Sequence, residues 1–179
     1  MRLEAIRQAL AALAVTEEVE VVKIIPAPKP AEGEEAAKPT EVREKVSQTM
    51  LFTPDHKKKG FNLDVKVPAA ELPVAAQALI DQGFFLEAIT GVDWPKERQI
   101  EVVYDFNHWD ELCRVVVRTR TDRDQPAVPT ISHIYSGANW HERETHDFFG
   151  VKFSGHPDLS PFLLPDDADY HPLRKDFKA

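Results

Sequence analysis

Cysteine is almost absent from this chain of 179 residues, which contains only Cys113, and no apolar run is long enough to cross a bilayer. A single cysteine forms no internal disulfide and cannot by itself ligate an iron–sulfur cluster. We expect Cys113 to be a small buried residue on a strand. The formal net charge of −8 argues against a nucleic-acid-binding protein, which would need a basic face. Glu4 and Arg7 interrupt the start of the chain, so no targeting signal is predicted and a cytosolic protein is expected.

Nucleotide- and metal-binding motifs are missing as well. There is no G-x-G-x-x-G, and the loop at 150–155 continues with His156 and Pro157 where a phosphate loop needs lysine and serine or threonine. His141 and His146 are turned by about 140° from each other on a regular helix, so they are not expected to share a metal ion. The sequence therefore predicts no catalytic residue, no cofactor-binding residue and no metal ligand in this chain.

Hydrophobic periodicity predicts an α+β fold. A helix and a strand are expected within residues 1–25, and the Pro-, Glu- and Lys-rich stretch 26–60 is predicted to be a flexible linker or insertion. The α+β core is expected over 61–153, and an extended, irregular C-terminal arm that binds a partner is expected over 154–179. Within the core, strands are predicted at 61–67, 84–90, 99–106 and 111–119, the last two as an antiparallel hairpin, with helices before Gly83, near 130–135 and from Trp140. This order predicts a mostly antiparallel sheet of four to five strands with helices on one face.

The helix expected after residue 138 has clear end signals. Asn139 is a candidate N-cap with Glu142 placed as in a capping box, and Gly150 is a candidate C-terminal stop. This helix is rich in both aromatic and charged residues, and Trp and Arg are common interface anchors. A solvated charged face is the alternative, but we favour an interface or internal salt bridges.

The last segment is broken by prolines and has neither a strand nor a helix period. Apolar residues nevertheless recur in it, whereas disordered segments are poor in them; these are Phe162, Leu163, Leu164, Tyr170, Leu173 and Phe177. We interpret it as an irregular arm that lies on another protein and does not hold its bound path without that partner.

These residues closely resemble one family, the thirty-kilodalton subunit of respiratory complex I and its counterparts in membrane-bound nickel–iron hydrogenases. The resemblance spans 61–177. It rests on Trp140, Glu-Arg-Glu at 142–144, Asp-Phe-Phe-Gly-Val at 147–151, Phe153, Gly-His-Pro-Asp at 155–158 and Pro-Leu-Arg-Lys-Asp-Phe at 172–177, with upstream landmarks at 91–93, 101–104 and 128–130. The chain departs from the complex I pattern at 160–162, where complex I members commonly carry two arginines, and 164–167 is similar to the hydrogenase-type relatives.

The resemblance implies a structural subunit without catalytic residues or a cofactor, active only within an oxidoreductase complex. Its implied partners are a large subunit, which forms a quinone site or holds a nickel–iron centre, and a small subunit that holds an iron–sulfur cluster. The implied location is peripheral, on the cytoplasmic face of a prokaryotic membrane and attached through the complex, with no nucleic acid involved.

The residues expected at the partner interface lie on the last helix and the arm. They are Trp140, Glu142, Arg143, Glu144, Asp147, Phe149, His156, Pro157, Asp158, Phe162, Leu164, His171, Leu173, Arg174, Lys175 and Phe177, with Gly150 and Gly155 as structural turns. Arg143 has acidic neighbours that can neutralise it in part. Arg174 is expected to pair across the interface, since arginine suits bidentate pairing with carboxylates.

Three alternatives stay open from sequence. The complex can be the quinone-reducing or the hydrogen-evolving type, and two Cys-x-x-Cys pairs in the large subunit would indicate nickel–iron. A stand-alone metal hydrolase using the histidines at 141–171 would contain stoichiometric metal. A soluble adaptor would co-purify with neither an iron–sulfur nor a membrane subunit.

Overall fold

The computed structural model describes residues 2–25 and 40–178, which form two compact units. The smaller unit is Thr16–Thr49, and the larger unit combines the residues before and after it. In the larger unit the Val15 N–H donates to Lys66 O and the Met50 N–H donates to Val15 O, both at 2.8 Å. These two bonds join the segments that flank the smaller unit to each other and to the sheet.

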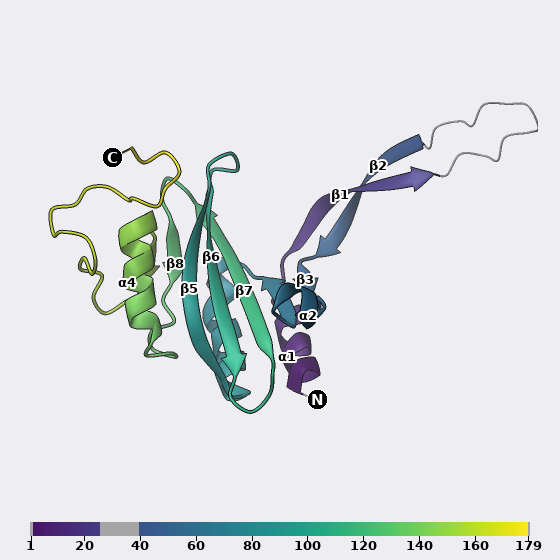
Figure 1. The fold of residues 1–179 in the computed structure, drawn as a ribbon, viewed down its shortest axis with the longest axis horizontal. Helices are drawn as coiled ribbons and strands as arrows, with labels where there is room; N and C mark the ends of the chain where they lie inside the picture. The colour runs from purple at the N-terminus through teal and green to yellow at the C-terminus, as the bar shows by residue number, and fades with distance from the viewer. Residues whose placement is uncertain (1, 26–39, 179) are drawn as a thin grey trace, which may run out of the picture. The chain divides into compact units, whose positions relative to one another are not determined.

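A five-stranded open sheet forms the centre of the larger unit, with strand order β3-β4-β7-β6-β5 (Figure 1). The strands are β3 (Leu51–Phe52), β4 (Leu63–Lys66), β5 (Phe84–Trp94), β6 (Gln99–His108) and β7 (Arg114–Asp122). Strands β4 and β7 are parallel, and the other three neighbouring pairs are antiparallel. The predicted mostly antiparallel sheet and the hairpin of β6 and β7 are therefore confirmed.

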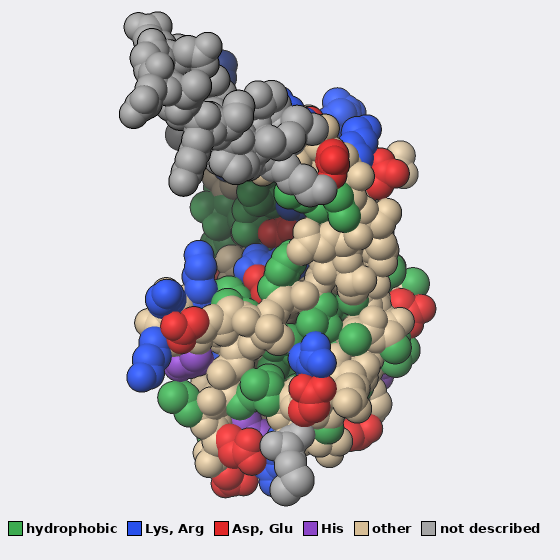
Figure 2. Space-filling model, turned by 90° about the vertical axis from the view of Figure 1, so that its right-hand side faces the viewer, with side chains coloured by type: hydrophobic (Ala, Val, Ile, Leu, Met, Phe, Trp, Pro, Cys, Tyr) green, Lys and Arg blue, Asp and Glu red, His purple; other side chains and the backbone are tan. Residues whose placement is uncertain are grey.

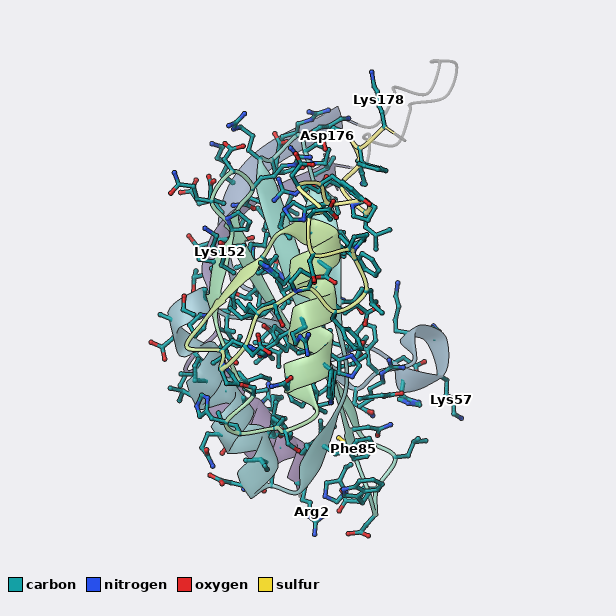
Figure 3. All side chains as sticks on the ribbon, turned by 90° about the vertical axis from the view of Figure 1, so that its left-hand side faces the viewer. Arg2, Lys57, Phe85, Lys152, Asp176 and Lys178 are labelled. Atoms are coloured by element: carbon teal, nitrogen blue, oxygen red, sulfur yellow. The ribbon has the colours of Figure 1, made fainter. Side chains whose placement is uncertain are left out.

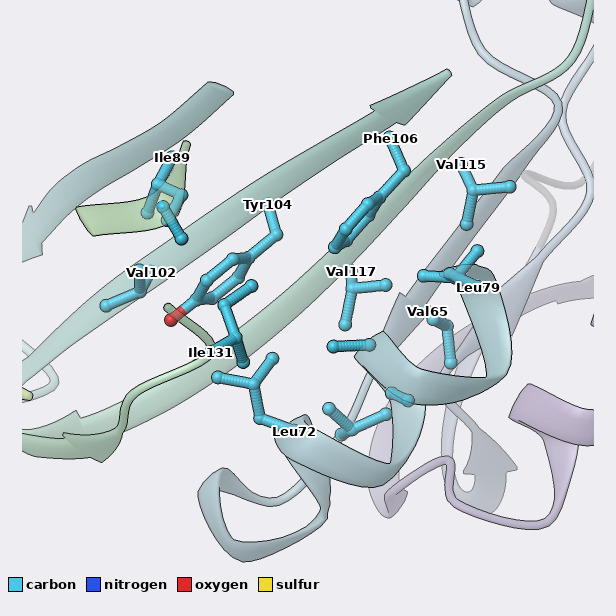
Figure 4. Packing of buried hydrophobic residues seen from close by; sticks show 14 of the residues in the cluster. Val65, Leu72, Leu79, Ile89, Val102, Tyr104, Phe106, Val115, Val117 and Ile131 are labelled. Carbon is cyan, nitrogen blue, oxygen red and sulfur yellow. The ribbon is translucent and has the colours of Figure 1, made fainter. Parts of the chain in front are cut away.

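Helices cover one face of this sheet. They are α1 (Arg2–Ala11), the 3₁₀ turn η1 (Ala69–Glu71), α3 (Leu72–Asp81) and α4 (Ala138–Phe149). Alternate side chains of β6, including Tyr104 and Phe106, point from the sheet toward Leu72 and Leu79 of α3 (Figure 4), and all of these are fully buried. Alternation along β6 thus separates a helix-covered apolar face from the opposite face.

The opposite face of the sheet carries a row of charges. Arg118 Nε donates to Asp64 Oδ1 and Arg120 Nε donates to Glu101 Oε1, both at 2.8 Å. Arg118 also lies 3.6 Å from Glu101, which links the two pairs across neighbouring strands. On the face of the molecule seen in Figure 2, acidic, basic and apolar side chains are intermixed, without a large area of one charge sign.

Helix α4 packs beside the edge strand β5 on the same face as α3. Gly91 of β5 pairs with Val102 of β6, and paired residues of neighbouring strands lie on the same face of the sheet. Gly91 therefore lies on the face that the helices cover. The position of a Cβ on Gly91 would lie 2.4 Å from Cδ2 of Phe149, so the absence of a side chain lets α4 approach the strand. Gly150 ends the helix in the left-handed conformation (φ 74°), as predicted, and its N–H donates to His146 O.

A short parallel pair, β8 (Ala127–Pro129) and β9 (Lys152–Ser154), flanks α4 in the chain. The sequence does not predict it, because strands of three residues are too short to show an alternating pattern. Strand β9 carries the chain from α4 into the arm.

Residues 26–60 are predicted to be a flexible linker or an insertion. A linker is wrong where residues 40–59 form strands and a helix, an insertion stays a prediction, and residues 26–39 lie outside the described residues. The structure has β1 (Thr16–Ile25) and β2 (Thr40–Thr49) as an antiparallel pair, from Thr16↔Thr49 to Ile25↔Thr40, followed by α2 (His56–Lys59). The physical reason is that a two-stranded ribbon has no buried face, so β2 can be almost as polar as a linker.

Two local predictions are wrong. Helix α4 begins at Ala138 with Gly137 as its N-cap and no side-chain capping bond, so Asn139 and Glu142 form no capping box. The residues near 130–135 form a turn instead of a helix, with Ile134 N–H and Tyr135 N–H both donating to Ile131 O at 2.9 Å.

Candidate partner interface on helix α4 and the C-terminal arm

The predicted interface residues lie on α4 and on residues 155–178, which we call the arm. The arm follows an irregular path over α4 (Figures 1 and 3) and is joined to it by hydrogen bonds. Three groups of contacts hold the arm. One group binds its first turn and its middle, one lies at the C-terminal end of α4, and one lies at the sheet.

Asp147 holds the middle of the arm. Its Oδ2 accepts the backbone N–H groups of Phe162, Leu163 and Leu164, at 2.9, 2.7 and 3.2 Å. Three donors on one carboxylate oxygen replace the water that this buried acid loses. Because the bonds go to main-chain atoms, they hold the arm while its side chains remain available for other contacts.

Arg143 holds the preceding turn of the arm and lies beside two aromatic rings, which also pack against each other. Its guanidinium donates to the carbonyl oxygens of Ser160 and Pro161, both at 3.1 Å. The same group lies 5.3 Å from the ring centroid of Trp140 and 5.2 Å from that of Phe162, within the range of cation–π contact. The predicted neutralisation of Arg143 by neighbouring acids is replaced here by carbonyl and ring contacts.

The last turn of α4 binds the arm a second time. His171 Nδ1 lies 2.8 Å from Asp147 O, the Leu173 N–H donates to Phe148 O (3.2 Å), and Arg174 Nε donates to Phe149 O (2.8 Å). The carbonyl groups at a helix C-terminus have no partner in the helix, and here the arm supplies the donors. Arg174 Nε thus has an acceptor within its own chain, because the arm folds back over the helix end, and pairing of Arg174 across the interface stays a prediction.

Asp93 and Arg123 bind the end of the arm to the sheet. Arg123 Nε and one Nη donate to the two Asp93 carboxylate oxygens at 2.7 and 3.0 Å, and the Lys175 N–H donates to Asp93 Oδ2 at 2.8 Å. Arg123 also donates to Asp176 at 2.6 Å. The hydrogen bond from Arg123, helped by the Lys175 N–H, holds the pKa of Asp93 below its usual value. We call Asp93, Arg123, Lys175 and Asp176 the clasp.

Apolar side chains of the arm and α4 remain at the surface although the backbone beneath them is bound. Exposure reaches 55% for Trp140, 52% for Leu163 and 53% for Leu173. Phe162, Tyr170 and Phe177 are also exposed, and the last two stack on each other with ring centroids 5.5 Å apart. Backbone N–H groups of the arm thus face α4, while large apolar side chains remain at the surface beside exposed charged residues such as Asp166 and Asp167.

Glu142 is fully buried and lies away from this surface. It accepts the Ile131 N–H at 2.8 Å and the Thr130 hydroxyl, and His156 Nε2 lies 3.8 Å away, also buried. Burial raises the pKa of Glu142 to about 7, although the bonds from Thr130 and Ile131 oppose the rise. As a partner contact Glu142 is therefore a wrong prediction: its carboxylate fixes the loop before α4.

The remaining predicted residues divide by exposure. Partly or fully exposed are Glu144, Pro157, Asp158, Leu164 and Lys175, while Phe149 and the side chain of His156 are buried. Gly155, like Gly150, has a positive φ, which fits its predicted role in a turn. Whether the exposed residues contact a partner stays a prediction.

Sequence reasoning misses the clasp. Asp93 belongs to a family landmark, but Arg123 falls in a stretch that the sequence predicts only as a turn. A signal is present: Asp93 lies two positions from Gly91 and four from Ile89, so an acid stands on the strand face that packs inward. Such an acid needs a cationic or N–H partner.

A group of potential metal ligands is not found at this surface. Among residues 2–25 and 40–178, no group of three or more His, Cys, Asp and Glu side chains is placed to hold a metal ion. A small hollow of about 130 Å³ lies between β5 and α4 and includes Gly91, Phe149 and Leu173. None of the helices in the described part of the chain is long and apolar enough to span a bilayer. The exposed apolar side chains of α4 and the arm can bind another apolar surface.

Comparison with known proteins places these features in a family. Residues 65–179, more than half of the chain, match the family described as "Respiratory-chain NADH dehydrogenase, 30 Kd subunit". The C subunit of the NADH-quinone oxidoreductase of Moorella thermoacetica is 43% identical over 114 residues, which cover 63% of this chain and 77% of that protein. The C subunit of the F420H2 dehydrogenase of Methanosarcina mazei is 38% identical over 93 residues, covering 51% of this chain and 59% of that protein.

A solved structure shares the fold. It is a chain of the membrane-bound sulfane sulfur reductase (MBS), an archaeal respiratory membrane complex, with a TM-score of 0.59 and 36% identity over 65% of this chain and 71% of that chain. The matched stretch spans 77% of the Moorella thermoacetica protein and about half of several other curated relatives, but only 18% of a longer fused C/D subunit. The family match includes α4, the clasp and the whole described arm, and the chain belongs to the family of the 30 kDa subunit of respiratory-chain NADH dehydrogenase.

Proposed function

We propose that this chain is a non-catalytic structural subunit of a complex-I-like, membrane-attached, ion-translocating oxidoreductase. It takes part in electron transfer only as part of the assembled complex, and the iron–sulfur clusters, with a quinone site or a nickel–iron centre, belong to its partners. The relatives named as subunits of NADH-quinone oxidoreductase, F420H2 dehydrogenase and a sulfane sulfur reductase support a role in such complexes.

The observation that carries the proposal is the exposed apolar surface of α4 and the arm. Trp140, Leu163 and Leu173 are each more than half exposed, on a backbone that is already held by Asp147, Arg143 and the clasp. Binding a partner there buries apolar area without first ordering the arm, which reduces the entropic cost of association. We assign this surface to the large subunit, with the iron–sulfur small subunit beside it.

The same geometry fits a hydrogen-evolving complex. The Leu-Pro-Asp-Asp sequence at 164–167, which resembles hydrogenase-type relatives, supports this second candidate. The solved relative from an archaeal respiratory complex has a different named activity from the NADH-quinone relatives. The identity of the large subunit distinguishes the two candidates, through the presence or absence of its two Cys-x-x-Cys pairs.

In either complex the chain is a peripheral subunit on the cytoplasmic side, attached to the membrane through its partners. The solved relative belongs to a respiratory membrane complex, which supports the association with a membrane.

The proposal is tested by affinity purification of the tagged chain from its native host, with the partners identified by mass spectrometry. Trp140→Ala and Leu173→Ala should each reduce the abundance of the complex on native gels, while turnover per assembled complex stays unchanged. Val74→Ala is a matched control, because Val74 on α3 is 53% exposed, like Leu173, but lies outside the surface. Recovery of neither an iron–sulfur nor a membrane subunit with the unmodified chain would refute the proposal.

A further inference from the structure

A second exposed apolar group lies at the turn between β6 and β7. Trp109 is 76% exposed and Leu112 is 80% exposed, more than any apolar side chain of α4 or the arm. Phe85, at the start of β5, packs against Trp109 with ring centroids 4.1 Å apart and an interplanar angle of 30°. We call Phe85, Trp109 and Leu112 the hairpin tip.

The turn that carries the hairpin tip is held in place by His108. The Nδ1 atom of His108 accepts the backbone N–H groups of Asp110 and Glu111 at 3.1 and 3.2 Å. Its ring packs edge-on against Phe84, and Arg2 of α1 contacts Nε2 of the same ring. The exposed Trp109 ring therefore stands on a turn whose backbone is already ordered, as expected for an anchor that binds without reorganisation.

Carboxylates border the hairpin tip. Asp110 is 82% and Glu111 is 49% exposed at the side chain, and Asp81 lines a hollow of about 460 Å³ beside Trp109. The cation of this border is Arg2, which lies 3.9 Å from Asp110 and 3.7 Å from Glu111. An acidic border around an exposed tryptophan complements a basic protein surface and disfavours an anionic lipid surface.

The hairpin tip is distant from the end of the arm. Figure 3 shows Arg2 and Phe85 at one end of the larger unit and Asp176 and Lys178 at the other. Strand β5 connects them, since Phe85 lies at its start and Asp93 of the clasp near its end. The two surfaces can therefore be occupied by two different partners at the same time.

We infer that the hairpin tip is a second docking surface, which inserts Trp109 and Leu112 into an apolar pocket of another protein subunit whose border carries Lys or Arg. The inference rests on the proposed function, because it takes the occupant to be a subunit of the same complex. It adds that this chain bridges two subunits, one on α4 and the arm and one at the hairpin tip.

The test uses the complex purified from the native host with tagged variants of this chain. Trp109→Ala removes the anchor and should weaken retention of one subunit upon dilution by about 30-fold, the effect of a hot spot of about 2 kcal/mol. Asp110→Lys combined with Glu111→Lys keeps the apolar residues and should weaken retention most strongly at low salt. The far-UV circular dichroism of each isolated variant confirms that it folds, and Val74→Ala serves as the matched control.

The occupant is identified by p-benzoyl-L-phenylalanine incorporated at position 109 and irradiated in the assembled complex. A cross-link to another subunit beside Lys or Arg residues supports the inference. A cross-link to lipid, a cross-link to a second copy of this chain, or no cross-link overturns it. Loss of the complex in Leu173→Ala but full retention in Trp109→Ala would overturn the hairpin-tip inference and leave the proposed function intact. If the unmodified chain recovers no subunit, the proposed function itself fails.

Discussion

Asp147 Oδ2 accepts the backbone N–H of Leu163 at 2.7 Å, so an acid of α4 holds the middle of the arm through a main-chain atom. The side chain of Leu163 stays 52% exposed despite this bond. Binding of the arm and recognition by the arm are thus assigned to different atoms, which allows each to be tested without removing the other.

Replacing Asp147 by alanine should release the arm. The N–H groups of Phe162, Leu163 and Leu164 lose their acceptor, and a hydrogen bond to a charged group contributes about 1.5–3 kcal/mol. Limited proteolysis followed by mass spectrometry should show faster cleavage near 162–164. Asp147→Asn keeps one carbonyl oxygen and should be intermediate.

Asp158→Ala is the control for this experiment, since Asp158 is an exposed acid of the arm that accepts the N–H of Ser160 locally. Equal cleavage of Asp147→Ala and the unmodified chain would show that Asp147 does not hold the arm. The same experiment tests the expectation from sequence that the arm does not hold its path without a partner. The bonds to Asp147 and Phe149 O favour the opposite result, an arm as resistant as the core in the unmodified chain.

Removing Arg123 should destabilise the larger unit strongly. Asp93 has no exposed side-chain area and Arg123 is 14% exposed, and truncating one member of a buried pair costs roughly 3–5 kcal/mol because the other charge is stranded. Urea unfolding of Arg123→Ala measures this cost. Asp93→Asn combined with Arg123→Ala should recover part of it, because the uncompensated charge is gone.

The pair Arg98 and Asp124 provides the comparison. Its side chains are 69% and 55% exposed, so Arg98→Ala should change the free energy of unfolding by no more than about 1 kcal/mol. The pH dependence follows from the lowered pKa of Asp93: the stabilisation is complete above the unfolded pKa and is lost as the pH falls through the folded pKa. A cost for Arg123→Ala no larger than that for Arg98→Ala would show that the clasp is weak.

The sheet and its helices were predictable because burial imposes a period on the sequence. In β6, residues such as Tyr104 and Phe106 alternate with polar ones, and this alternation predicts the strand and its hairpin partner. Strand β2 was missed since it pairs with β1 in a separate two-stranded unit, where no buried face imposes alternation.

The types of residue at the candidate interface were predictable from the sequence, but the groups to which their side chains bond were not. Glu142 has the spacing of a capping box, yet its carboxylate bonds to Ile131 and Thr130, which lie in a loop that local spacing cannot position. For Arg174 the sequence suggested no contact within the chain, but the path of the arm brings its Nε to Phe149 O. Long-range backbone paths decide both outcomes, and periodicity does not encode them.

A side chain at position 91 should push α4 away from the sheet. In Gly91→Ala the new Cβ would lie 2.4 Å from the Phe149 ring, which is buried and held just before the helix end. Overpacking of this kind costs about 1–3 kcal/mol. Because Phe149 O also binds Arg174, the end of the arm should loosen, with faster proteolysis after residue 170.

Gly137→Ala is the matched substitution. Its Cβ meets no atom within 4 Å, and its φ of −63° suits alanine, so the free energy of unfolding should stay the same or rise by about 0.4–1 kcal/mol. Equal stability of Gly91→Ala and Gly137→Ala would mean that α4 does not press on β5 at this point.

The buried carboxyl of Glu142 should make the chain less stable as the pH rises from about 4.5 to 7. Its pKa is about 7 in the folded protein and 4.5 as an ordinary glutamate, so the unfolded chain releases the proton first and folding loses stability over this interval. A displacement of about 2.5 in pKa corresponds to about 3 kcal/mol. Glu142→Gln resembles the protonated acid in shape and hydrogen bonding, so it should remove this dependence.

The measurement is therefore the difference in free energy of unfolding between Glu142→Gln and the unmodified chain, from urea titrations at pH 5 and pH 8. Taking the difference cancels the titration of groups that both proteins share. From pH 5 to pH 8, the free energy of unfolding of Glu142→Gln should rise by up to about 3 kcal/mol relative to that of the unmodified chain. The reason is that only the unmodified chain must ionise a buried carboxyl. A difference that does not change with pH would mean that Glu142 is already ionised at pH 5, and that its bonds from Thr130 and Ile131 outweigh its burial.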